Sequence, residues 1–188
     1  TVVYFGLTAS GYGLILWMPN YIKSLASSLG NFGIGVVSII PYTATAAAMV
    51  LIGSRSDRTC KHRAFLAGSA LSAAAFLFIA ANMSSIVPGL AFVSLALMAT
   101  FSMQGPFWAT STSLLGGTPA AAGIAVINSL GNLGGYFGPK IIGLSRTWGS
   151  GFRGGMLVIS ACLVLAGLVA LMVRAQDGSS SSQRHPLQ

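Results

Sequence analysis

The chain has 188 residues, of which 54% are hydrophobic and only 6% are charged. An ordinary soluble domain carries about 25% charged residues, so the composition excludes a soluble protein and predicts a multi-pass membrane protein. The net charge of +8 reflects basic residues that set the topology and a shortage of acids, because the chain has ten Lys and Arg but two acidic residues. Nucleic acid is therefore not an expected partner, whereas the lipid bilayer is.

Six apolar segments have roughly the 20 residues that an α-helix needs to cross a bilayer. Runs of this length are too long for barrel strands, so the sequence predicts an all-α membrane protein with six transmembrane helices. The expected spans, in chain order, are Val2–Ile22, Gly33–Ile52, Ala64–Ala81, Val87–Leu115, Ala120–Leu144 and Gly154–Val173.

A charged loop, 53–63, separates the second and third spans and contains four basic residues. Short loops rich in Lys and Arg stay on the cytoplasmic side of the membrane, which orients the whole chain. Alternation of six spans then places the C-terminal end in the cytoplasm as well. The domain prediction is a six-helix bundle over residues 1–174, followed by a polar cytoplasmic tail over 175–188 whose four consecutive serines predict disorder.

The prolines suggest an internal repeat. Pro19 and Pro41 lie in the first two spans and the third has none, while Pro106 and Pro139 lie in the fourth and fifth and the sixth has none. Helices interrupted at matching positions of two triplets are typical of a transporter built from two three-helix inverted repeats.

The charged loop also carries a motif. Gly53-x-x-x-Asp57-Arg58, followed by basic residues as far as Arg63, resembles the cytoplasmic-loop motif of the major facilitator superfamily. The glycine would let two helix ends approach closely, and Asp57 could face the positive end of a neighbouring helix or pair with an arginine. We expect Gly53, Asp57, Arg58 and Arg63 to form a conformational latch, with a simple orientation anchor as the alternative. Cys60 departs from the motif, in which glycine is common at that position.

Amides and glycines share the fifth span. Asn128 and Asn132 are four residues apart and so lie on one helix face. Amides at membrane depth must face protein or a water-filled path, so these two either contact substrate or hold helices together. Close helix contact is predicted at two pairs of glycines, Gly131 with Gly135 and Gly134 with Gly138.

Together with Trp17-Met-Pro19, Ile40-Pro41-Tyr42 and Phe107-Trp108, this span resembles the C-terminal half of the anion:cation symporter family within that superfamily. Members of the family have twelve spans and carry organic anions such as tartrate and sugar acids. The resemblance covers nearly all of residues 1–174. It implies that the chain supplies the last six spans, that an N-terminal six-helix half is its missing partner, and that it lies in a bacterial inner (plasma) membrane without a cofactor.

Polar and aromatic residues also recur at four-residue spacing elsewhere. Tyr4, Thr8 and Tyr12 form such a stripe on the first span, and Gln104, Trp108 and Thr112 form another on the fourth. A tryptophan near mid-span favours a cavity lining over a headgroup anchor, with core packing as the alternative. The predicted substrate path consists of Tyr12, Gln104, Trp108, Asn128 and Asn132. Three of these residues, Tyr12, Trp108 and Asn128, are implied by the resemblance.

Charge at membrane depth is scarce. The only acids, Asp57 and Asp177, lie outside the spans, so no carboxylate of this chain can carry a symporter's proton across. Lys140 is the sole charge within a span, and it either reaches the outer surface or binds the substrate anion. No catalytic or metal site is predicted, which excludes a membrane enzyme such as an intramembrane protease.

The function expected from these features is transport of a small organic anion, a carboxylate or sugar acid, by alternating access. Coupling to protons or cations would require the full-length protein, of which this chain is an incomplete half. A homo-oligomeric six-helix channel or scaffold is the alternative, because the glycine-rich faces allow self-association.

Overall fold

The computed structural model describes residues 1–26, 28, 30–115 and 120–172, and every regular element in this part of the chain is an α-helix. The expected tail, 175–188, lies outside the described residues. Seven helices are described, namely α1 (Val2–Leu25), α2 (Asn31–Thr59), α3 (His62–Ala81), α4 (Ile86–Ser102), α5 (Gln104–Leu114), α6 (Ala120–Thr147) and α7 (Gly151–Met172).

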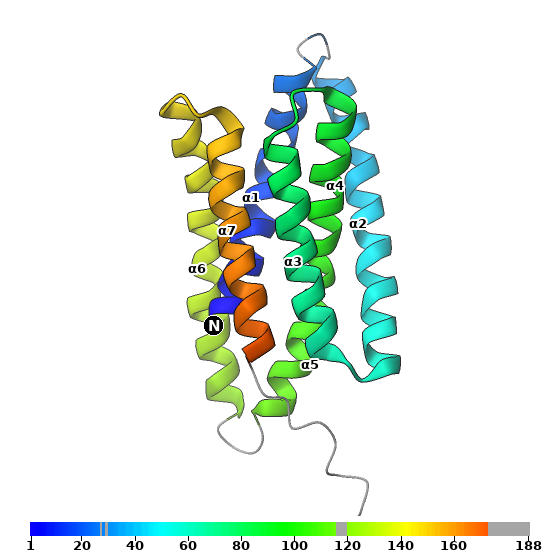
Figure 1. The fold of residues 1–188 in the computed structure, drawn as a ribbon, viewed down its shortest axis with the longest axis vertical. Coiled ribbons are helices and arrows are strands. Elements are labelled where there is room, and N and C mark those ends of the chain that lie inside the picture. The colour runs from blue at the N-terminus through cyan, green and yellow to red at the C-terminus, as the bar shows by residue number, and fades with distance from the viewer. Residues whose placement is uncertain (27, 29, 116–119, 173–188) are drawn as a thin grey trace, which may run out of the picture.

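The helices form an upright bundle in which consecutive spans run in opposite directions, with α4 and α5 in one span (Figure 1). α1 packs against α6 and α7 on one side and against α2 and α4 on the other, and α3 packs against α7 and α4. Small side chains such as Ala70 and Ala73 are fully buried beside Leu77 and Leu97. The core therefore lies around α1 and α3, between the outer helices α2 and α6.

Five spans of the described chain are long and apolar enough to cross a membrane: α1, α2, α3, the combined α4–α5 span and α7. α6 has 28 residues, but its asparagines and glycines make it less apolar than the others. The six expected spans are thus present as helices, which confirms the all-helical class.

α2 lies at the edge of the bundle. In the apolar stretch of 18 residues that would cross the membrane, 28% is buried in α2, against 61% in α1. Its exposed side chains include Phe32, Ile40, Val50 and Leu51, which water would solvate poorly. This face is suited to contact lipid or another apolar helix.

The segment 53–63 is not the loop that the sequence predicted. α2 continues as far as Thr59, and α3 begins at His62, so only Cys60 and Lys61 separate the two helices. Residues 54–59 contain no glycine or proline that would end a helix. The helix ends instead where Cys60 adopts the left-handed conformation, with φ of 52°.

The prolines interrupt the helices less than expected. The fourth span, expected as Val87–Leu115, divides at Met103 into α4 and α5. Pro106 explains the division because it has no N–H for the carbonyl of Ser102 and its ring crowds that oxygen. Three other helices run through their prolines without a break: α1 at Pro19, α2 at Pro41 and α6 at Pro139.

Candidate functional site

α6 approaches α1 closely along a row of buried glycines, Gly131, Gly134 and Gly138. A methyl group at Gly134 would overlap the backbone carbonyl of Phe5 and would stand 2.9 Å from the backbone nitrogen of Ala9. The close helix contact predicted from these glycines is present, and α1 is the helix that they meet.

The predicted stripe on α1 divides between two environments. Thr8 is buried and its hydroxyl donates to the carbonyl of Gly131 on α6, while buried Tyr4 stacks on Phe107 with ring centroids 5.0 Å apart. Tyr12 is 50% exposed, and its ring lies 3.0 Å from the position of an added Cβ at Gly135. Only Tyr12 therefore stands at an open face.

Four side chains form a polar row along the exposed face of α6, called here the α6 polar stripe: Asn128, Asn132, Tyr136 and Lys140. The Nδ2 of Asn132 donates to the Oδ1 of Asn128 at 2.9 Å, and the Nζ of Lys140 donates to the hydroxyl of Tyr136 at 3.1 Å. The two asparagines belong to the substrate path predicted from the sequence, whereas Tyr136 does not. Recurrence at every fourth residue was the signal that could have revealed it.

Trp108 and Gln104 lie on α5, and both are partly buried. Trp108 packs edge-on against Tyr4 with ring centroids 5.2 Å apart, which joins it to α1. The Oε1 of Gln104 and the Oγ1 of Thr100 are buried and have no hydrogen-bond partner among the described residues. Buried polar atoms usually have a partner, so this point of the α4–α5 break can accept a hydrogen bond from a ligand or water.

Three of the five predicted path residues thus come to one face of the bundle. The ring of Tyr12 packs over Gly135, which lies one turn along α6 from Asn132. Asn132 in turn donates a hydrogen bond to Asn128. Trp108 contacts α1 at Tyr4, and Gln104 is one turn before Trp108 on α5. The substrate-path role of all five stays a prediction.

A groove of about 610 Å³ lies between α1 and α6 towards their C-terminal ends. The indole Nε1 of Trp17, at its edge, donates to the carbonyl of Pro139 at 2.9 Å and so holds the two helices together. The residues that line the groove include Leu16, Trp17, Gly135, Tyr136, Pro139 and Lys140.

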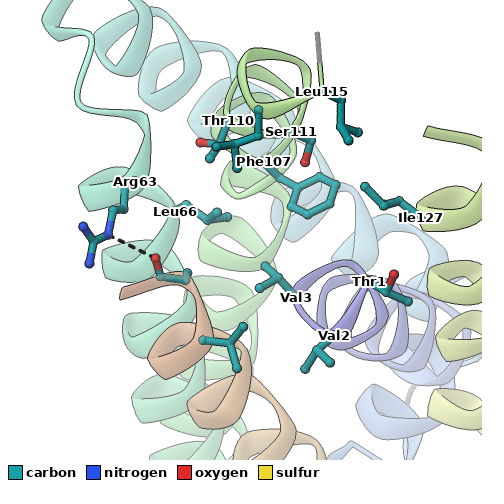
Figure 2. Close-up of a pocket in the computed structure, with 13 residues that line it drawn as sticks. Thr1, Val2, Val3, Arg63, Leu66, Phe107, Thr110, Ser111, Leu115 and Ile127 are labelled. Carbon is teal, nitrogen blue, oxygen red and sulfur yellow. Dashed lines mark hydrogen bonds between the residues drawn. The ribbon is translucent and has the colours of Figure 1, made fainter. Parts of the chain in front are cut away.

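A cavity of about 340 Å³ lies at the opposite end of the bundle, where α1, α3, α5 and α7 converge (Figure 2). Its walls are mainly apolar and include Val3, Leu66 and Phe107. Figure 2 shows Arg63 at the edge with its guanidinium turned away from the cavity, where its Nε donates to the carbonyl of Ala170 at 3.3 Å. The sequence pattern did not predict this cavity, because ordinary apolar residues of several distant segments form it.

Asp57 is the carboxylate of the predicted latch. It lies in the last turn of α2 with its side chain 72% exposed, and its Oδ1 is 3.8 Å from the Nδ1 of His62. The same ring nitrogen is 2.9 Å from the hydroxyl of Ser56. Asp57 thus sits at the N-terminal end of α3, where free backbone N–H groups favour a negative charge. In the part of the chain that the structure describes, no arginine pairs with it.

The other latch residues are divided among different contacts. Arg63 binds the last turn of α7, and Arg58 is exposed at the end of α2. An added Cβ at Gly53 would meet no described atom within 4 Å, although the Cα of Gly53 lies 3.7 Å from the Cβ position of Gly105. Gly53 therefore lies beside α5, and the latch role of these residues stays a prediction. Over the described residues, no cluster of His, Cys, Asp or Glu could hold a metal ion.

The chain is similar to bacterial transporters over most of its length. It is 34% identical over 187 residues to an Agrobacterium vitis protein named as a tartrate transporter, a match that covers 100% of this chain and 43% of the relative. It is 33% identical over 173 residues to the quinolone resistance transporter of Acinetobacter baumannii, covering 92% of this chain and 40% of that protein. It is 30% identical over 175 residues to the inner membrane transport protein RhmT of Escherichia coli, with the same two coverages. No family model matches the chain, and no solved structure matches it significantly.

The chain spans less than half the length of the curated relatives that it matches, between 38% and 43% for the two proteins of Agrobacterium vitis. These relatives are named as transporters rather than as enzymes, and one of them is an inner membrane protein. With its apolar helices, the chain is a multi-pass protein of a bacterial inner membrane. It belongs with these bacterial membrane transporters, which are of the major facilitator type.

Proposed function

We propose that this chain is the C-terminal six-helix half of a transporter of the anion:cation symporter family, and that it helps to move a small organic anion by alternating access. Two relatives that are 34% and 35% identical are named as tartrate transporters, which supports a carboxylate or sugar acid as the substrate. Another relative is named for quinolone resistance. The names of the relatives therefore do not identify the substrate class by themselves, and the residues of the site must support it as well.

The observation that carries this proposal is the α6 polar stripe beside Tyr12. Its two amides and its ammonium group are exposed on α6, which packs along the apolar helices α1 and α7 and would cross the membrane beside them. Exposed groups of this kind are unfavourable against lipid tails, so they face a second domain or a water-filled path. A path between two halves of a transporter meets both conditions.

The predicted path residues have the chemistry that a carboxylate requires. Asn128 and Asn132 retain N–H groups beyond the one that joins them, and amide N–H groups donate hydrogen bonds to carboxylate oxygens. Gln104 offers a third amide, while Tyr12 and Trp108 offer flat apolar surfaces with one polar group each. Among the described residues the carboxylate is that of Asp57, at the end of α2, so the proton or cation that drives transport would bind to the missing N-terminal half.

The proposal includes the architecture of the bundle over residues 1–174. α1, α2 and α3 would form one three-helix repeat, and the α4–α5 span, α6 and α7 would form the inverted second one. Opposite directions of consecutive spans are compatible with this assignment (Figure 1).

The proposal also assigns the latch to the cytoplasmic end of α2. Asp57 at the start of α3 and exposed Arg58 would contact the other half in one conformation only, with Gly53 and Arg63 holding α2 beside α5 and α3 beside α7. Replacing Asp57 by Asn in a complete transporter should then change both the transport rate and the populations of the two conformations. Unchanged values of both would contradict the latch.

Uptake of labelled tartrate and other carboxylates into cells tests the function. The chain would be expressed alone and together with the N-terminal half of the Agrobacterium vitis relative, with that half alone as the control. We expect uptake only when both halves are present in the membrane. Uptake by the chain alone would favour a homo-oligomeric channel, and absence of carboxylate uptake from the paired halves would contradict the proposal.

A further inference from the structure

Lys140 is the charged side chain farthest from any helix end among the described residues. α6 continues for seven residues beyond it, to Thr147, which corresponds to about 10 Å along the helix. A lysine that reached for the outer surface would extend towards that end of α6. Its Nζ instead lies 3.1 Å from the hydroxyl of Tyr136 and 5.0 Å from the centre of that ring, one turn closer to the middle of the helix.

The direction of this side chain gives the α6 polar stripe a positive end. Tyr136 and Lys140 follow Asn132 at successive four-residue steps, so the ammonium group points back along the row of amides. In the described part of the chain Asp57 is the only carboxylate, and it lies at the opposite, α2–α3 end of the bundle. The charge of Lys140 is therefore not neutralised by an acid within the described residues.

The groove beside Lys140 can accept a small molecule. It is an open groove of about 610 Å³ rather than an enclosed pocket, so a bound molecule would be covered on its other side by the second half of the transporter. Most of its lining is apolar, including Leu16 and Leu144, so Lys140 and Tyr136 are prominent polar groups there. Once the second half covers the open side, these apolar walls would lower the local dielectric constant and strengthen the attraction between an ammonium group and an anion.

We propose that Lys140 and Tyr136 form an outer binding point for a carboxylate group of the transported anion. The ammonium group of Lys140 supplies the charge and a charge-assisted hydrogen bond, and the phenol of Tyr136 donates a second bond to the same carboxylate. Asn132 and Asn128 then continue the path towards the middle of the membrane. This inference rests on the proposed function and adds to it a preference for carboxylates over neutral polyols of the same size.

The first test measures KM and Vmax for tartrate uptake by the paired halves described above. Lys140→Gln should raise KM by about ten- to a hundredfold, because a hydrogen bond to a charged group is worth about 1.5–3 kcal/mol. Lys140→Arg should restore most of the affinity, and Tyr136→Phe should raise KM less than Lys140→Gln does. The matched control is Lys23→Gln, which removes an exposed charge from the last turn of α1 and should leave KM unchanged.

The second test does not require transport. Lys140→Cys, in a background with Cys60→Ala and Cys162→Ala, would be exposed in cells to a membrane-impermeant, negatively charged thiol reagent. We expect reaction from the outside, and we expect tartrate, but not its neutral diamide, to slow the reaction several-fold.

The outcomes separate this inference from the proposed function. Normal KM in Lys140→Gln, with uptake intact, would overturn the role of Lys140 and leave the proposed function standing. A lower Vmax at unchanged KM, without protection by tartrate, would also overturn it, since Lys140 would then pair with the other half rather than with substrate. Absence of uptake from every pair, wild type included, would overturn the proposed function and this inference with it.

Discussion

Replacing Gly134 by Ala should separate α1 from α6. The new methyl group would overlap the carbonyl of Phe5 and the hydroxyl of Thr8, and it would stand 2.9 Å from the backbone nitrogen of Ala9. Two of these three neighbours are backbone atoms, which cannot rotate away as a side chain could. The helices must therefore move apart by several tenths of an ångström.

The structure sets the expected size of this effect. Overpacking a tight contact costs about 1–3 kcal/mol, and separation of the helices weakens the hydrogen bond from Thr8 to Gly131, worth about 1 kcal/mol. Alanine in place of a helical glycine returns about 0.5–1 kcal/mol of backbone entropy. The net loss should be about 1–3 kcal/mol, which corresponds to a fall in Tm of roughly 2–12 °C for a chain of this size.

Thermal unfolding of the purified chain in detergent, followed by circular dichroism, measures this loss. Gly68→Ala on α3 is the matched control, because an added methyl there would meet no described atom within 4 Å. We expect the control to unfold at the wild-type temperature or slightly above it. If Gly134→Ala were as stable as Gly68→Ala, α1 and α6 would not pack through their backbones as described.

Two further substitutions test the end of the bundle where α2 meets α3. Cys60→Gly should raise stability by about 1 kcal/mol, because a non-glycine residue with φ of 52° is strained, and Cys60→Ala should not; equal Tm values for both would contradict the strain. Arg63→Gln should lower stability by about 1 kcal/mol through loss of its bond to the carbonyl of Ala170 and of a positive charge at the end of α7. Arg58→Gln removes a positive charge from the last turn of α2 without such a bond to any described residue and serves as the control in the same unfolding assay, so an equal effect of both changes would speak against the α3–α7 bond.

Several features of the site show why the spacing of residues along one helix could not predict which side chains are exposed. Tyr4, Thr8 and Tyr12 are equivalent by spacing, yet Tyr4 and Thr8 are buried and Tyr12 is 50% exposed. The helix that packs on each residue decides its environment, and spacing along one helix does not say where that neighbour ends. Spacing likewise does not say in which direction the side chain of Lys140 extends, and its contact with Tyr136 shows that it extends towards the preceding turn of α6.

The sequence by itself determined the membrane class, the helical class and the approximate limits of the six spans. These properties follow from the solvent: a bilayer requires about 20 apolar residues per crossing and requires each backbone group to bond within its own helix. They are local, so a single segment is enough to reveal them. The extension of α2 to Thr59 was misjudged because polar composition alone does not end a helix.

Tertiary structure alone decided which helices meet. It joined the glycines of α6 to Phe5 and Ala9 of α1, placed Tyr12 over Gly135, and brought Arg63 of α3 to the end of α7. Each of these contacts links residues that are far apart in the chain. The small residues that permit close approach specify no particular partner, and the packing of the whole bundle selects one.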